Sequence, residues 1–228
     1  MNKNDMEIVN GVLVKYTGDD TKVVIPDTVK IIGEKAFADS LVEEVVLPDS
    51  VTVIGYGAFM ECLELEKITL SKSLKEIKAL AFQDCESLKE IDFPDSLVKI
   101  GERAFINNGF EKLVIPDSVI TIEPDVFELC QELKEVFLSR SLKSIEGCVF
   151  ATCVKLTSIT IPDSVTSIED SAFCNCTNLK EVIIPSSVTH IGDDVFSGCI
   201  SLTSVTIPDS VTEIGNNVFE GCTNLKQE

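Results

Sequence analysis

The chain has 228 residues, 44% of them hydrophobic and 25% charged, which is enough length and apolar content to bury a large core. Its 38 acidic residues outnumber 19 lysines and arginines, and the net charge of −19 argues against nucleic acid or a bare anionic membrane as a partner. No apolar run approaches the roughly 18 residues that a membrane-spanning helix needs, which excludes an integral membrane protein of that kind.

Residues 1–20 are predicted to form a capping hairpin. Two apolar runs, 8–9 and 12–14, flank Asn10-Gly11, and Asn-Gly between apolar runs is the strongest short hairpin signal. The first residues hold no seven-residue apolar stretch and no small-residue cleavage site, so they do not indicate a signal peptide. Two locations follow as expectations: the cytoplasm if this is the full gene product, and the cell surface or medium if it is a mature form or a fragment.

Residues 21–228 are predicted to be a repeat array of nine units of 22 or 23 residues. One phenylalanine column runs through every unit: Phe37, Phe59, Phe82, Phe105, Phe127, Phe150, Phe173, Phe196 and Phe219. A second column holds proline or, in two units, serine: Pro26, Pro48, Ser71, Pro94, Pro116, Ser139, Pro162, Pro185 and Pro208. Because one unit cannot bury its apolar residues alone, the units must stack and share a core. The predicted fold is a repeat solenoid of nine coils with short parallel strands.

The segment before the proline column alternates inward and outward residues, which predicts a short strand. In LTSVTIPDSV, Val205 and Ile207 are expected to point inward, and Ser204 and Thr206 outward. Pro208 ends the strand because proline cannot donate a ladder hydrogen bond. The Pro-Asp-Ser turn is expected to be held by side chains that bond local amides.

The rest of the unit returns along a second edge. Val211 and Ile214 are expected to point inward, and Gly215 is expected at a corner that needs a positive φ. The following segment predicts a helical or 3₁₀ turn that seats Phe219 and Cys222 in the core. The sequence ends where another strand is expected, so the last coil should expose an edge that invites pairing with another chain, including a second copy.

The unit IPDSVTSIEDSAFCNCTNLKEV resembles the BspA-type leucine-rich repeats of bacterial and protist surface proteins, and the opening NGVLVKYTG with VVIPDTVKIIGEKAF is similar to the start of such arrays. The resemblance covers residues 10–228 and is carried by repetition of I-P-x-x-V, I-G, A-F and C-x-x-L. It implies a curved right-handed leucine-rich-repeat solenoid with a strand ladder on one face. It also implies protein binding, often adhesion to host matrix proteins or cells.

Seven of the nine cysteines form a third column: Cys62, Cys85, Cys130, Cys153, Cys176, Cys199 and Cys222. Packing as small buried hydrophobes is favoured over a metal site, because a stack places one thiol per coil whereas metal ligands must converge. The two shorter units hold Ser40 and Asn108 instead, which predicts that the tighter loop has no room for the thiol. Cys148 and Cys174 lie outside the column, and a disulfide between them is an open alternative.

The turn aspartates form a column that Lys72, Arg140 and Ser186 interrupt: Asp27, Asp49, Asp95, Asp117, Asp163 and Asp209. Turn capping is favoured over calcium binding, because the column is interrupted and no calcium-loop glycine pattern is present. The lysine and the arginine are expected to relieve repulsion within this acidic row.

The outward strand positions are the favoured binding surface, because regular solenoids bind partners on such ladders. Phe137 is the expected anchor, since large aromatic residues dominate binding hot spots. Val114, Phe137 and Ile183 are apolar where water is expected, which marks an interaction site, although strand propensity alone is the alternative explanation. The candidate site comprises the outward residues Val46, Asp92, Val114, Phe137, Thr160 and Ile183 with the neighbouring Lys112 and Glu135.

No catalytic, cofactor or metal site is predicted. The single histidine, His190, is expected to lie solvated on the return strand, and the motifs of serine hydrolases, P-loops, dinucleotide sites and zinc proteases are absent. The predicted function is a protein-binding module, either surface-exposed and adhesive or an intracellular scaffold. A structural array that self-associates through its C-terminal edge is a further alternative.

Overall fold

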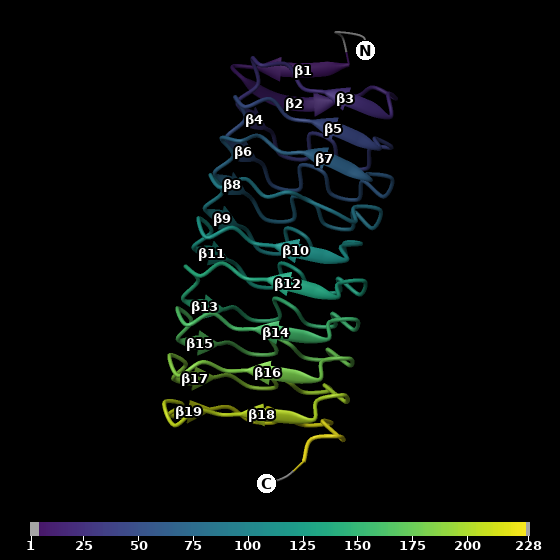
Figure 1. Cartoon of the computed structure of the whole chain (residues 1–228). Coiled ribbons are helices and arrows are strands. Elements are labelled where there is room, and N and C mark those ends of the chain that lie inside the picture. Colours follow the sequence, from purple (N-terminus) through teal and green to yellow (C-terminus); the bar gives the residue numbers. More distant parts are fainter. Residues whose placement is uncertain (1–4, 227–228) are drawn as a thin grey trace.

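Successive repeat units stack as coils along one axis, with the two ends of the chain at opposite ends of the stack (Figure 1). The computed structural model describes residues 5–226, and over that range the chain is a β-solenoid of about 9 turns of ~23 residues. This architecture confirms the predicted solenoid. No helix within residues 5–226 is long and apolar enough to cross a membrane.

Each coil places its strands on two faces of the solenoid. The face that we call the wide face holds three-residue strands: β3 (Lys22–Val24), β5 (Glu44–Val46), β7 (Lys67–Thr69), β10 (Lys112–Val114), β12 (Glu135–Phe137), β14 (Ser158–Thr160), β16 (Glu181–Ile183) and β18 (Ser204–Thr206). The narrow face holds two-residue strands: β4 (Ile31–Ile32), β6 (Val53–Ile54), β8 (Glu76–Ile77), β9 (Lys99–Ile100), β11 (Thr121–Ile122), β13 (Ser144–Ile145), β15 (Ser167–Ile168), β17 (His190–Ile191) and β19 (Glu213–Ile214). A third side, the phenylalanine side, consists of turns.

Parallel pairing in a one-repeat register aligns equivalent residues of neighbouring coils. On the wide face, Val182 of β16 lies between Ile159 of β14 and Val205 of β18. The middle residue of each strand is inward and its two neighbours are outward, as the alternating sequence predicts. The outward residues therefore form continuous columns on the surface.

The phenylalanine column forms the spine of the core. Neighbouring rings lie nearly parallel, with centroids 4.9–5.0 Å apart from Phe37 to Phe105 and 5.5–5.8 Å apart from Phe105 to Phe219. At Phe105, the rings of Phe93 and Phe110 add edge contacts, each with its centroid 5.6 Å away. Three aromatic side chains thus meet at the level where the ring spacing changes.

The turns of the phenylalanine side correct the prediction of a helical or 3₁₀ segment, because neither helix type forms within the described range. The residues two before and two after each phenylalanine have positive φ, as at Lys35 (52°) and Asp39 (61°) around Phe37. A backbone that changes hand every few residues cannot coil into a helix. Its amides bond the next coil instead, as where the Phe37 amide donates to the Ala58 carbonyl at 2.8 Å.

The column cysteines also bond a neighbouring coil. The Sγ of Cys62 donates to the Phe37 carbonyl oxygen at 3.0 Å, and the six other column thiols make the equivalent bond at 3.1–3.3 Å. In one of the shorter units, Asn108 donates from Nδ2 to the Phe82 carbonyl oxygen at 2.8 Å. That loop accommodates an amide larger than a thiol, so lack of room does not explain the lost cysteine. Asn108 keeps the hydrogen bond to the preceding coil that the column thiols make.

The N-terminal hairpin covers the first coil. β1 (Met6–Val9) pairs antiparallel with β2 (Val12–Tyr16), and the turn residues Asn10 and Gly11 have φ of 51° and 80°, which suits Asn-Gly. Strand β2 pairs with β4, and the Tyr16 ring stacks on Phe37 with centroids 4.9 Å apart. The boundary at residue 20 between cap and array stays a prediction, and residues 1–4 of that predicted cap lie outside the described range.

The last coil differs from the prediction in two ways. Gly215 has no positive φ; a Cβ there would lie 2.4 Å from the carbonyl carbon of Gly192 in the preceding coil, so close backbone approach is what requires glycine. Ile207 and Ile214 were expected to point inward but are 37% and 53% exposed. Within residues 5–226 no further coil covers them.

Candidate protein-binding surface

The outward column of the wide face presents the predicted site residues to solvent. Exposed are Asp92, Lys112, Val114, Glu135, Phe137, Thr160 and Ile183, while Val46 is half-buried. The three apolar members Val114, Phe137 and Ile183 are 55%, 51% and 66% exposed. The structure brings four of these residues together on β10 and β12 and leaves Val46 and Ile183 on separate sheets.

We call Lys112, Val114, Glu135 and Phe137 the β10–β12 patch. The pairing of β10 with β12 places Lys112 opposite Glu135, and Val114 opposite Phe137. The Lys112 ammonium lies 2.9 Å from the Glu135 carboxylate and 5.0 Å from the centroid of the Phe137 ring, which is a cation–π distance. The patch therefore offers two adjoining apolar side chains beside a lysine whose charge is already neutralised.

The wide-face ladder is interrupted on both sides of this patch. Strands β3, β5 and β7 form one sheet, β10 and β12 a second, and β14, β16 and β18 a third, while residues 90–92 form no strand. An open groove of about 500 Å³, the N-side groove, is lined by Glu90, Asp92, Phe93, Asp95, Lys112 and Val114 among others. A second of about 510 Å³, the C-side groove, is lined by Glu135, Phe137, Arg140, Thr160 and Asp163 among others. The patch thus stands between two grooves.

The interruption before β10 coincides with two large side chains. Phe93 and Phe110 occupy columns where the other units have leucine, isoleucine or valine, and both rings pack against Phe105. Extra volume in a close-packed core displaces backbone. We assign the missing strand at residues 90–92 to this extra ring volume.

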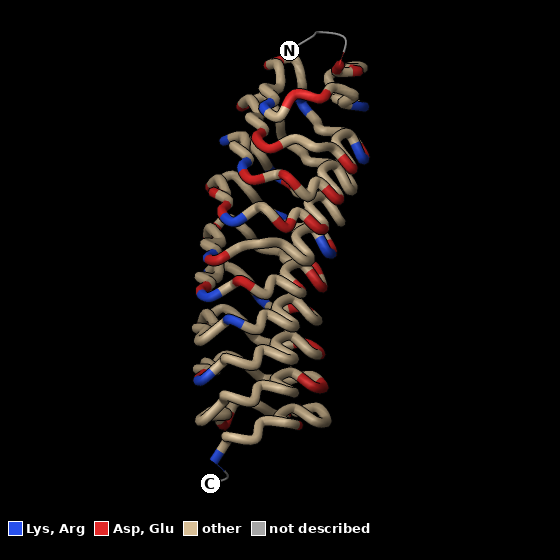
Figure 2. The backbone as a smooth tube through the Cα atoms, turned by 90° about the vertical axis from the view of Figure 1, so that its right-hand side faces the viewer, with Lys and Arg blue, Asp and Glu red and all other residues tan. Residues whose placement is uncertain are grey.

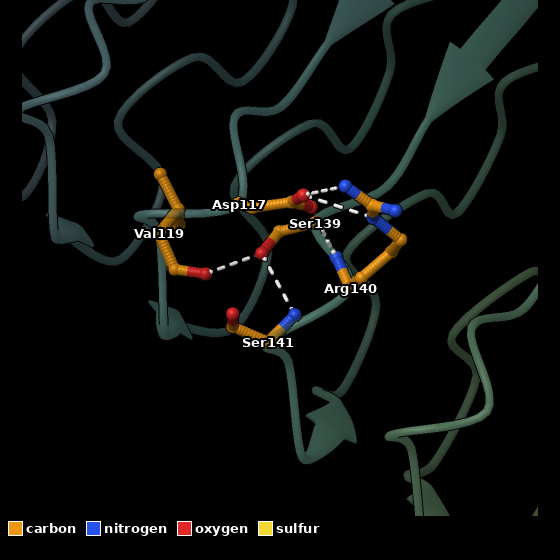
Figure 3. Close-up of polar contacts among 5 residues, drawn as sticks. All are labelled: Asp117, Val119, Ser139, Arg140 and Ser141. Carbon is orange, nitrogen blue, oxygen red and sulfur yellow. Dashed lines mark hydrogen bonds and ion pairs between the residues drawn. The ribbon is translucent and has the colours of Figure 1, made fainter.

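The interruption after β12 extends to the narrow face, where β11 and β13 are not hydrogen-bonded to each other. Side chains join the two coils at this junction (Figure 3). The hydroxyl of Ser139 donates to the Val119 carbonyl oxygen at 2.7 Å and accepts a bond from the Ser141 amide at 3.1 Å. The Arg140 amide donates to the Asp117 carboxylate at 2.8 Å. Serine in the proline column therefore supplies a bond that proline could not.

Arg140 also forms an ion pair with Asp117, with Nε 2.9 Å from Oδ2. The bonds from Arg140 lower the pKa of Asp117 below its ordinary value. This contact confirms that the arginine relieves charge in the aspartate column. In addition, Asp49 accepts a bond from the Lys72 amide at 3.0 Å. Both aspartates bond the next coil rather than local amides, which corrects the prediction of local turn capping for these two residues.

One member of the outward column was missed. Val24 of β3 is 51% exposed and lies opposite Val46. Its place two residues before Pro26 matches that of Val46 before Pro48 and was visible in the sequence. The two grooves left no sequence signal of comparable clarity.

Other candidate residues are accounted for by packing and charge pairs. The His190 side chain is 38% exposed, in keeping with the prediction of a solvated histidine, and it lies with Nδ1 3.1 Å from the Glu213 carboxylate and Nε2 3.9 Å from that of Glu169. Cys148 and Cys174 are both free thiols. Across residues 5–226, no three histidine, cysteine or acidic side chains gather as metal ligands. Charged positions instead recur at similar places in successive coils (Figure 2).

Short parallel strands, one-repeat register and a shared core define a leucine-rich-repeat solenoid with an open strand face. The family model described as BspA type leucine rich repeat region matches residues 15–123 and 98–226, with six copies. The chain therefore belongs to the BspA-type leucine-rich repeat family, and the resemblance seen in the sequence is confirmed.

Solved structures of bacterial leucine-rich repeat proteins are similar to the chain. One from Bacteroides ovatus is 25% identical, with a TM-score of 0.61, over 95% of this chain and 88% of the other. TpLRR of T. pallidum is 28% identical, with a TM-score of 0.67, over 90% and 91%. The pneumococcal vaccine antigen PcpA is 24% identical, with a TM-score of 0.57, over 90% and 67%, and shares the fold. None of the curated proteins compared with the chain matches it in sequence.

Proposed function

We propose that the chain acts by binding a protein partner on the wide face, with the β10–β12 patch at the centre of the contact. The observation that carries this proposal is the pair of exposed apolar side chains, Val114 and Phe137, set side by side on a rigid sheet. Apolar groups of this size, rimmed by charge, are typical of interaction sites. The adjoining grooves provide concave surfaces into which side chains of a partner can insert.

The setting that the family resemblance favours is cell-surface adhesion or contact with host proteins. An intracellular scaffold is the alternative. Fractionation of the source cells separates the two, because surface localisation makes the protein accessible to added protease and a scaffold is protected.

The Phe137→Asp substitution is expected to abolish partner binding. The substitution removes the Phe137 ring that the partner would cover and puts a charge in its place. Loss of such a hot-spot residue costs about 2 kcal/mol or more of binding free energy, roughly thirtyfold in Kd. The measurement compares wild type and variant as baits for host-matrix and cell extracts, followed by Kd determination with the purified captured protein. The matched control is Thr206→Asp, an exposed residue of the same column on β18. Equal affinity of Phe137→Asp and wild type would remove the wide face as the site.

Self-association through the C-terminal coil is a second candidate, favoured by the exposure of Ile207 and Ile214. In the preceding coil the amide of Phe196 donates to the Val218 carbonyl oxygen at 2.9 Å, whereas the equivalent amide of Phe219 has no following coil in the described part of the chain. β18 and β19 are the last strands of their sheets within residues 5–226, and an open strand edge with apolar side chains favours pairing.

Light scattering over a wide range of protein concentration tests this second candidate. We expect the apparent mass of the wild type to rise with concentration and the Ile207→Asp/Ile214→Asp variant to stay monomeric. Ile120→Asp is the matched control, because Ile120 is 56% exposed on the narrow face in the middle of the array. A wild-type monomer at every concentration would contradict self-association.

A further inference from the structure

The two grooves beside the β10–β12 patch have a similar chemical composition. Each combines an apolar or aromatic wall with carboxylates. In the N-side groove, Phe93 and Val114 adjoin Glu90, Asp92 and Asp95. A long side chain with a cationic head fits such a wall, because its methylene groups cover apolar surface while its charge reaches the carboxylates.

The C-side groove has the same character with an aromatic ring. Phe137 lines it together with Asp163, and the Lys112 ammonium already lies 5.0 Å from the centroid of that ring. The Phe137 ring therefore already forms a cation–π contact with Lys112 of the same chain. A second cation from a partner would meet the same chemistry inside the groove.

The two cationic side chains that line the grooves form ion pairs within the chain. Lys112 pairs with Glu135 at 2.9 Å, and Arg140 pairs with Asp117. None of the ion pairs formed within residues 5–226 involves the groove carboxylates Glu90, Asp92, Asp95 and Asp163. The patch is thus apolar at its centre and has, in both flanking grooves, carboxylates that form no ion pair within the described residues.

We propose that the occupant of this surface is a basic polypeptide segment, with an apolar side chain on Val114 and Phe137 and lysine or arginine side chains in the two grooves. The inference rests on the proposed function and names its partner class. Charge complementarity favours it, since the protein carries a net charge of −19 that attracts basic partners. The same charge disfavours nucleic acid and anionic membranes.

The strand spacing sets the separation of the partner's cations. The grooves lie on either side of two paired strands, and paired strands are about 4.8 Å apart, so the grooves are roughly 10 Å apart. An extended chain rises about 3.3 Å per residue and its side chains alternate between two sides, so basic residues four positions apart, with an apolar residue midway, face the patch together and span it.

A random twelve-residue peptide library displayed on phage is the probe, selected on the full chain and counter-selected on the Phe137→Ser variant, which removes the ring without adding a charge. The enriched peptides are expected to carry two or more lysine or arginine residues spaced four apart around an apolar residue. Synthetic copies should bind at least tenfold more weakly to a variant with Glu90→Gln, Asp92→Asn, Asp95→Asn and Asp163→Asn, and more weakly at high salt. These carboxylates form no side-chain hydrogen bond or ion pair within residues 5–226, so the variant should keep the wild-type circular dichroism spectrum.

A second variant controls for overall charge. It carries Glu34→Gln, Glu61→Gln, Glu64→Gln and Glu220→Gln, which are exposed glutamates outside the patch and its grooves. This variant makes the same change in net charge and should bind the peptides as the wild type does. Enriched peptides that are neutral or acidic, or equal affinity for both variants, would overturn the basic partner while leaving the wide face as the site. If no peptide is enriched over the Phe137→Ser counter-selection, the proposed binding face fails as well.

Discussion

Replacing Phe105 by alanine is expected to lower the free energy of unfolding by about 3–5 kcal/mol, the cost of truncating a fully buried phenylalanine. The Phe105 ring is fully buried and contacts four others, stacking on Phe82 and Phe127 and meeting Phe93 and Phe110 edge-on. Its removal leaves a cavity that the close-packed neighbours cannot fill. Chemical denaturation followed by circular dichroism measures the loss.

The control for Phe105 is the same substitution at the end of the spine. Phe219 is half-buried and stacks on Phe196 alone among the aromatic residues of the described range. In a solenoid the stability is close to a sum of nearest-neighbour terms, so an interior ring contributes to two interfaces and a terminal ring to one. Phe219→Ala should therefore cost less than half as much as Phe105→Ala. Equal losses at the two positions would show that the rings do not form a stacked spine.

The sequence alone predicts the solenoid because the number of residues between equivalent side chains equals the number of residues in one coil. A phenylalanine every 22 or 23 residues must return to the same place if one unit is one coil. The alternation before the proline column likewise assigns Val114 and Phe137 to the outside, and both are about half exposed. Because the strands pair in a one-repeat register, the residues of each outward column can be predicted from the sequence repeat alone.

The grooves and turns could not be predicted because they depend on contacts between different coils. Phe93 and Phe110 are visible as large residues in aliphatic columns, but their meeting at Phe105 is a tertiary fact. Residues such as Lys35 and Leu80 adopt positive φ although neither favours it. The hydrogen bonds to the next coil fix that conformation, and local propensity gives no sign of it.

Asn108 replaces a cysteine of the column, and the two side chains share a hydrogen-bond donor rather than a volume. The sequence predicts that the column cysteines pack as small hydrophobes, and in the structure each column thiol also donates to a phenylalanine carbonyl oxygen. Asn108 preserves this donation with a different group. The Phe37 carbonyl oxygen also accepts the Ser40 amide at 3.0 Å, so the column side chains add a second hydrogen bond that joins neighbouring coils.

The native protein is expected to resist thiol reagents at all its deeply buried cysteines. Burial raises the pKa of Cys130 to about 12 and that of Cys153 well above its ordinary value. The thiolate is the reactive form, so at pH 8 the reactive fraction of Cys130 falls roughly a thousandfold below that of an unfolded thiol with a pKa of about 8.5. Titration with a chromogenic disulfide reagent should show a fast phase from the half-buried thiols and a slow remainder, and all nine cysteines should react rapidly in denaturant.

Labelling of the two cysteines outside the column tests whether the pKa of a thiol limits its reactivity when the thiol is only half-buried. Cys148 is half-buried, and burial raises its pKa to about 11, so its labelling should speed up roughly tenfold per pH unit between pH 8 and pH 10 as the thiolate forms. The Cys148→Ser/Cys174→Ser variant should lose most of the fast phase, leaving Cys222 in the last coil as the remaining half-buried thiol. Fast labelling of Cys130 or Cys153 in this native variant would mean that the coils open readily. In that case a stack held by buried thiol-to-carbonyl bonds would not describe the protein in solution.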